Sequence, residues 1–274
     1  MGNKILVSVF DSERTAFEGL TALKELHKDG DITLYASTVI AKDPTGTVSV
    51  RQAEDRGPIG TAVGMLTGGL VGLLGGPLGV AVGVYVGGFG GLMYDLFKAG
   101  VGMDFVDEVS ASLTPGKAAV VADIDETWVT PVNTRLEALG GTTFRRLQGE
   151  VIDAELIRET DAARLELEQL QAELRETSGE AKANVEKAID AQRSRLEAMV
   201  DRVDKALAQQ NAEFQARLAT LREQYDLARE SQKQRIDARI DELKASHEVR
   251  KAKLEEARRH AKASVEATRE ALVP

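Results

Sequence analysis

The stretch GPIGTAVGMLTGGLVGLLGGPLGVAVGVYVGGFGGLMY, residues 57–94, contains 38 consecutive residues without a charged side chain. Glycine recurs in it at every fourth position, and residues four apart lie on the same face of a helix. A proline follows two glycines at residues 75–77, where one glycine series gives way to a second. The stretch therefore predicts two short apolar helices joined by a tight turn, and the rest of the chain is organised around this hairpin.

Glycine at this spacing removes the side chains from one helix face, so that a second backbone can approach closely. Each glycine costs a helix about 1 kcal/mol relative to alanine. That cost must be offset by close helix packing or by a bilayer, because a helix in a bilayer satisfies its own backbone polar groups. The residues that we expect to pack helices and to join copies of the chain are Gly60, Gly64, Gly68, Gly72, Gly76, Gly79, Gly83, Gly87 and Gly91.

Two environments remain open for this glycine-zipper hairpin. Residues 58–74 would extend about 25 Å as a helix, and a hydrocarbon core is about 30 Å thick, so each arm is short for a membrane span. The hairpin also fits the interior of a soluble oligomer, because short apolar segments are often core helices. A phosphate-binding loop does not fit, because no Gly-Lys-Ser/Thr follows the glycines.

The charge distribution divides the chain of 274 residues near Gly149. Charged residues make up about a fifth of residues 1–149 and about two fifths of residues 150–274. The net charge of −9 offers no basic face for nucleic acid. The absence of cysteine excludes disulfides and thiolate sites. The first apolar run, residues 5–10, is too short for a secretory signal, so we expect both ends of the hairpin to return to the cytoplasmic side.

Alternating apolar residues and turn signals predict a small sheet on both sides of the hairpin. We expect strands at residues 4–10, 32–42, 48–52, 117–124 and 142–147, and helices from Asp11 or Ser12 to residue 28, at 104–113 and at 129–139. This order fits an α+β sandwich of the ferredoxin-like kind, with the hairpin inserted in one connection. The expected domains are therefore residues 1–56 with 95–149, the hairpin at 57–94, and a helical domain at 150–274.

These segments also carry a resemblance to a known family. KILVSVF, LKELHKDG, ITLYASTVIAKDPTGTVSV, the glycine block with GGPLG at its turn, and DFVDEVSASLTPGKAAVVADI occur here in order. In this order the chain resembles a bacterial family known as domain of unknown function number twelve-sixty-nine, over about residues 3–148. Its members are usually described as probable membrane proteins. The resemblance implies the fold and a membrane link, brings no catalytic residues, and does not extend to the C-terminal half.

Residues 150–273 contain no proline and a single glycine, Gly179, which is a composition typical of long helices. Apolar residues recur in it every eleven positions, which predicts a straight or slightly right-handed coiled coil with a bend at residues 178–179. The residues expected at its contacts are Leu174, Val185, Leu196, Met199, Val203, Leu207, Phe214, Leu218, Leu221, Tyr225, Ile236, Ile240 and Leu243. Copies of the helix, a lipid surface and solvent remain open as its surroundings, and we favour copies of itself.

Few residues carry a signal for chemistry. His27, His247 and His260 are isolated in the sequence, and we expect surface positions for them. Asp123, Asp125 and Glu126 cluster at a predicted strand end, where a cation is one interpretation and ordinary exposed charges are the other. Trp128, the only tryptophan, fits either an interface anchor or the core of the sheet. We therefore expect no catalytic residues, no cofactor and no bound metal.

The sequence thus favours a non-enzymatic, self-assembling scaffold at the cytoplasmic face of the cell membrane. Its expected partners are copies of itself and the lipid bilayer, without nucleic acid or a small-molecule substrate. Long helices would then build a ring, cage or filament. The alternative is a soluble, cytoplasmic homo-oligomeric shell or stress-linked assembly in which the hairpins form a buried protein core.

Overall fold

The computed structural model describes residues 4–54, 67, 103–147 and 150–271. The chain divides into two compact units: unit 1 comprises residues 1–150 and 213–244, and unit 2 comprises residues 151–212 and 245–274. The strands lie before residue 149 and the long helices after it. Residues 213–244, however, are part of unit 1 together with the sheet.

Unit 1 is built on a five-stranded antiparallel sheet with the strand order β3-β2-β4-β1-β5. The strands are β1 (Lys4–Phe10), β2 (Ile32–Lys42), β3 (Val48–Glu54), β4 (Ala118–Glu126) and β5 (Thr142–Leu147). Every residue of β4 is buried, as befits a strand that lies between β1 and β2 in the centre of the sheet. The α+β class and the order of elements expected from the sequence are therefore confirmed.

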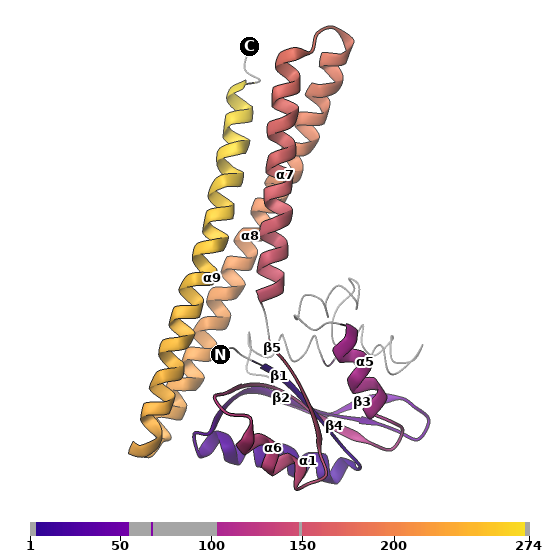
Figure 1. Ribbon diagram of the computed structural model, residues 1–274, viewed down its shortest axis with the longest axis vertical. Coiled ribbons are helices and arrows are strands. Elements are labelled where there is room, and N and C mark those ends of the chain that lie inside the picture. Colours follow the sequence, from indigo (N-terminus) through magenta and orange to yellow (C-terminus); the bar gives the residue numbers. More distant parts are fainter. Residues whose placement is uncertain (1–3, 55–66, 68–102, 148–149, 272–274) are drawn as a thin grey trace. The chain divides into compact units, whose positions relative to one another are not determined.

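Two helices cover one face of the sheet, α1 (Glu13–Lys28) and α6 (Thr130–Glu137) (Figure 1). The hydroxyl of Ser12 caps α1 by accepting a hydrogen bond from the backbone N–H of Thr15. Leu20, Leu23 and Leu26 form the buried stripe of α1 and belong to one core with Leu6 and Phe10 of β1. The 3.6-residue spacing of that stripe is the pattern that predicted the helix.

The opposite face of the sheet is covered by α5 (Met103–Ser112) and by residues 213–244. Phe105 and Val109 of α5 pack in one core with Ile5 and Val7 of β1. Leu221 and Ile236, from the two sides of the helical turn in residues 213–244, belong to the same core. Both faces of the sheet are therefore buried within unit 1.

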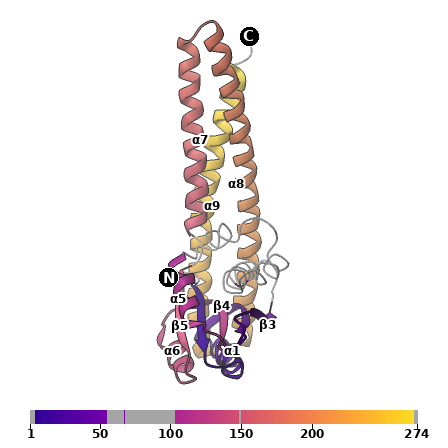
Figure 2. The same ribbon diagram turned by 90° about the vertical axis from the view of Figure 1, so that its right-hand side faces the viewer.

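The C-terminal half forms three helices, α7 (Glu150–Glu176), α8 (Glu180–Leu227) and α9 (Glu230–Ala271). The bend expected at residues 178–179 is present, and Gly179 adopts a φ of 68° there, a left-handed conformation that glycine tolerates best. A second break, at residues 228–229, was not expected from the sequence and separates α8 from α9. Within unit 2, α7, α8 and α9 run side by side (Figure 2).

The second turn contains neither glycine nor proline, and a side chain supplies its cap. The side-chain oxygen of Gln232 accepts a hydrogen bond from the backbone N–H of Arg229 (2.8 Å), as the third residue of a helix does in a capping box. The Gln232 amide nitrogen donates to the carbonyl oxygen of Asp29 at the end of α1 (2.7 Å). Gln232 thus caps the start of α9 and ties the turn to the end of α1.

Eleven of the thirteen residues expected at coiled-coil contacts pack in cores of this chain. Those in unit 2 contact one another and other residues of the three-helix bundle: Leu174, Val185, Leu196, Met199, Val203 and Leu207. Those in unit 1 pack in the core formed on the sheet: Leu221, Tyr225, Ile236, Ile240 and Leu243. Leu218 is buried as well, and Phe214 is partly buried. The apolar stripe therefore has intramolecular partners.

Candidate functional site

Apart from Thr67, the expected glycine-zipper hairpin lies outside the described residues, and so do its nine packing glycines. β3 ends at Glu54 and α5 starts at Met103, so the elements on either side of the expected hairpin both belong to unit 1. No helix among the described residues is both long and apolar enough to cross a bilayer. The candidate site that the structure does describe is the end of β4, where the acidic cluster lies.

The three acidic residues of this cluster do not converge. Successive side chains of a strand point to opposite faces of the sheet. Asp123 and Asp125 therefore lie on the face covered by residues 213–244, and Glu126 lies on the face covered by α1 and α6. No group of three metal-binding side chains occurs in the part of the chain that the structure describes. The cation interpretation of the cluster lacks the convergence of ligands that it requires.

Asp123 forms a buried ion pair with Arg217 of α8. The guanidinium donates two parallel hydrogen bonds to the carboxylate, Nη1 to Oδ1 at 3.2 Å and Nη2 to Oδ2 at 2.6 Å. Arg217 also contacts Glu213 one turn earlier at 2.9 Å, and its guanidinium lies 4.5 Å from the centre of the Tyr35 ring. Burial alone would lower the pKa of Arg217, but the carboxylates of Asp123 and Glu213 raise it, so the side chain stays charged.

A second set of polar contacts ties residues 213–244 to the start of β2. The Gln224 amide nitrogen donates to the carbonyl oxygens of Ile32 (2.7 Å) and His27 (2.6 Å), and its oxygen accepts from the Thr33 hydroxyl (2.8 Å). Arg239 donates from Nη1 to the Thr33 hydroxyl at 2.8 Å and from Nη2 to the carbonyl oxygen of Gly30 at 2.7 Å. These bonds fix the helical turn against the sheet by directional contacts.

Asp125 lies in the same region and is 9% exposed. Burial raises the pKa of Asp125 above its usual value, and the charge of Arg239 opposes this shift. Burial also raises the pKa of Tyr35, so its hydroxyl stays protonated. The Tyr35 hydroxyl and the Arg239 Nε have no hydrogen-bond partner among the described residues. The charges of this face therefore hold two parts of unit 1 together at a cost in desolvation.

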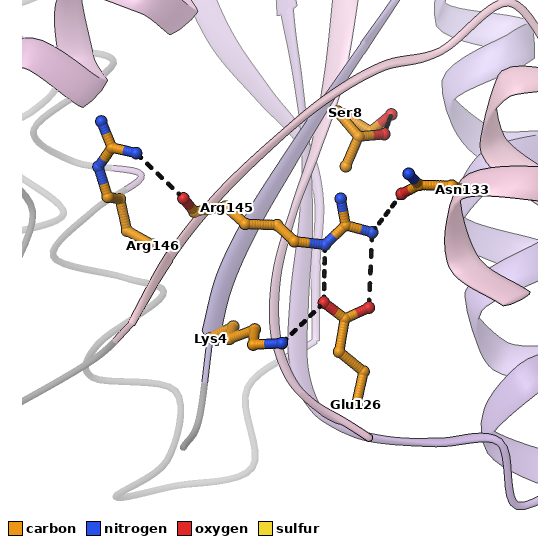
Figure 3. Close-up of polar contacts among 7 residues, drawn as sticks. Lys4, Ser8, Glu126, Asn133, Arg145 and Arg146 are labelled. Carbon is orange, nitrogen blue, oxygen red and sulfur yellow. Dashed lines mark hydrogen bonds and ion pairs between the residues drawn. The ribbon is translucent and has the colours of Figure 1, made fainter. Parts of the chain in front are cut away.

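Glu126, on the other face, is the centre of a separate network (Figure 3). Its fully buried carboxylate accepts a hydrogen bond from Arg145 Nε at 2.7 Å and contacts Lys4 Nζ at 3.3 Å. Arg145 also donates from Nη2 to the side-chain oxygen of Asn133 on α6 at 2.6 Å. The network therefore joins the end of β4 to the first turns of α6 through a side chain of β5.

Trp128 lies between Glu126 and Asn133 in the chain and is 59% exposed. The alternative that Trp128 belongs to the core of the sheet is thus wrong. Val129 beside it is also exposed, at 44%. The sequence could not place Trp128, because an aromatic residue directly after a buried strand fits both surface and core.

The histidines have different environments. His27 accepts a hydrogen bond at Nδ1 from the backbone N–H of Leu34 (3.2 Å), and His260 is exposed. His247 is 8% exposed in unit 2, which contradicts the expected surface position, and burial lowers its pKa. The eleven-residue spacing of the apolar stripe was a signal for this burial, because His247 follows Ile236 by eleven residues.

The comparison with known families agrees with the resemblance. The family model described as "Protein of unknown function (DUF1269)" matches residues 61–171, which include most of the glycine-rich stretch, α5, β4, α6, β5 and most of α7. The match starts and ends further along the chain than the resemblance, which covers about residues 3–148. The C-terminal half after residue 171 is not covered. No curated protein and no solved structure matches the chain.

Proposed function

For a chain whose central part matches a family of unknown function, we propose a non-enzymatic, self-assembling scaffold at the cytoplasmic face of the cell membrane. The observation that carries the proposal is the uncharged stretch of residues 57–94 with glycine at every fourth position. Such a stretch favours close packing of helices and an apolar surrounding. It is inserted between β3 and α5, so unit 1 would carry it as a support.

We also propose that unit 1 is ferredoxin-like, with β3, the hairpin and α5 added between two of its core strands. Without β3, the order of the remaining strands across the sheet is β2-β4-β1-β5. With α1 and α6 on one face, these four strands follow the β-α-β-β-α-β type of sandwich, in which the added elements interrupt one connection.

The packing of the apolar stripe bears on which surfaces would join copies of the chain. Because eleven of the thirteen stripe residues pack within the chain, the glycine faces are the better candidates for contacts between copies. The long helices would then extend a ring, cage or filament through their charged outer faces.

Substitutions at the glycine faces test self-assembly. Gly68→Leu or Gly83→Leu fills the bare face and is expected to reduce particle size in light scattering, because the helices can no longer approach closely. Gly68→Ala and Gly83→Ala are the matched controls, since alanine is still small enough for close packing. Particles of unchanged size in the leucine variants would contradict the assembly proposal.

A soluble shell with the hairpins in a protein core is the second candidate. One observation favours it: seventeen residues per arm, 58–74, reach only about 25 Å against a hydrocarbon core of about 30 Å. Carbonate extraction of cell membranes separates the two candidates. The membrane scaffold is expected to stay in the pellet, whereas a soluble shell would leave with the supernatant.

A further inference from the structure

Trp128 and Val129 form an exposed apolar pair in a loop that carries no charge. Residues 127–134 are Thr, Trp, Val, Thr, Pro, Val, Asn and Thr, and residues 128–130 are exposed. A tryptophan that is 59% exposed leaves most of a large apolar ring in water. Exposed aromatic residues of this kind are typical of surfaces that bind a partner or a membrane interface.

The structure holds this loop firmly from both sides. The Glu126 carboxylate, two residues before Trp128, is fully buried and paired with Lys4 and Arg145. The Asn133 side chain, five residues after Trp128, accepts a hydrogen bond from the same arginine (Figure 3). Pro131 further restricts the first turn of α6. A preordered loop loses little conformational entropy when its exposed side chains bind.

The position of the loop in the sheet agrees with a lipid surface. Glu126 pairs with Ile32 and Ile124 pairs with Lys4, so β4 ends where β2 and β1 begin. β3 is antiparallel to β2 and its last residue pairs with Ser37, so it runs toward this same end of the sheet. At that end, Asp104 in the first turn of α5 contacts Arg146 of β5. The strand that leads into residues 57–94 and the helix that follows them therefore face the end of the sheet that carries Trp128.

We infer that Trp128 and Val129 form a membrane-interface anchor, in which the indole ring enters the headgroup region of a bilayer. This inference rests on the proposed membrane association and assigns a second lipid contact outside residues 57–94. An uncharged loop with tryptophan at its exposed point suits this region, because the ring is apolar and its N–H can still meet a polar partner.

Trp128 is the only tryptophan, so its fluorescence reports on this loop alone. The full chain is mixed with phosphatidylcholine–phosphatidylglycerol vesicles, with and without bromine-labelled acyl chains, and binding is measured independently by flotation. The expected result is emission at shorter wavelength and quenching by the brominated lipid. Trp128→Ala is expected to lower vesicle affinity about tenfold, because the variant loses the transfer of one large aromatic ring from water into the lipid.

Two controls accompany the measurement. Trp128→Phe keeps an apolar ring and is expected to retain most of the affinity. Leu165→Ala removes another exposed apolar side chain, in unit 2, and is expected to bind as the wild type does. Circular dichroism should show the same helix content in all variants, because the changed side chains are exposed.

The outcomes separate this inference from the proposed function. Flotation with unchanged, unquenched Trp128 emission would overturn the anchor and leave the membrane scaffold standing. An emission shift that depends on protein concentration without lipid would assign the loop to a second copy of the chain and would also overturn it. If no variant and no wild-type protein floats with vesicles, both proposals fail.

Discussion

Arg217 on α8 and Asp123 on β4 are 94 residues apart in the chain and form a bidentate ion pair with both side chains buried. Replacing only Arg217 by methionine would leave the Asp123 carboxylate buried without its cation. Arg217→Met is expected to lower the free energy of unfolding by about 3–5 kcal/mol, as removal of one partner of a buried pair does. Urea denaturation measures this loss.

The exposed Arg222 on the same helix provides the control, and Arg222→Met is expected to change the unfolding free energy by less than about 0.5 kcal/mol. The double variant Asp123→Asn with Arg217→Met should be less destabilised than the sum of its two single variants, because no charge is left alone. If the losses in unfolding free energy of the two single variants simply add in the double variant, the interaction between the two side chains contributes little to stability.

The raised pKa of Asp125 predicts how the free energy of unfolding depends on pH. Burial raises its folded-state pKa above the unfolded value of about 3.9. The folded state therefore binds more protons than the unfolded state between these two pKa values, and the contribution of Asp125 to stability falls as pH rises through that window. Asp125→Asn removes this titration, so the unfolding free energy of the variant minus that of the wild type should rise with pH.

Urea denaturation at a series of pH values measures this difference, with the exposed Asp237→Asn as the control. A difference that is flat over the acid range, or that falls with pH, would show that the folded-state pKa of Asp125 is not raised.

The sequence predicted the elements of unit 1 well because local patterns determine them. The Ser12 cap, the leucine stripe of α1 and the turn at residues 43–46 are all short-range signals. The arrangement of residues 213–244 was not predictable in the same way. Its contacts with β4 span almost a hundred residues, and the stripe that carries Leu221 and Ile236 fits a sheet as well as another helix.

The acidic cluster shows the same limit. Three acidic residues in four positions left a cation site and ordinary exposed charges open as interpretations. Strand alternation sends Glu126 to the face opposite Asp123, and both side chains are buried. The cationic partners Arg145 and Arg217 come from β5 and α8, and the sequence contains no local sign of either pairing.

Gln232 provides a test of the turn that the sequence did not predict. Its side chain accepts from the Arg229 N–H and donates to the Asp29 carbonyl oxygen. Gln232→Ala removes both bonds and is expected to lower the unfolding free energy by about 1–2 kcal/mol, within the range for a lost helix cap. Gln234→Ala, two residues later and exposed, should leave it unchanged in urea denaturation. Equal effects of the two substitutions would contradict the capping role.

Replacing Gly19 in α1 by alanine has two opposing effects on stability, one from helix propensity and one from packing. Alanine favours a helix over glycine by about 1 kcal/mol, so propensity alone predicts that Gly19→Ala stabilises unit 1. A Cβ at Gly19, however, would collide with the ring of Phe10, which is buried between α1 and the sheet. Because overpacking in a core costs about 1–3 kcal/mol, the variant is expected to be less stable than the wild type.

Thermal unfolding followed by circular dichroism measures whether the substitution stabilises or destabilises the protein, and Thr21→Ala, on the exposed side of α1, is the control. A raised melting temperature for Gly19→Ala would show that Phe10 can move aside and that the packing of α1 on β1 is looser than its geometry indicates.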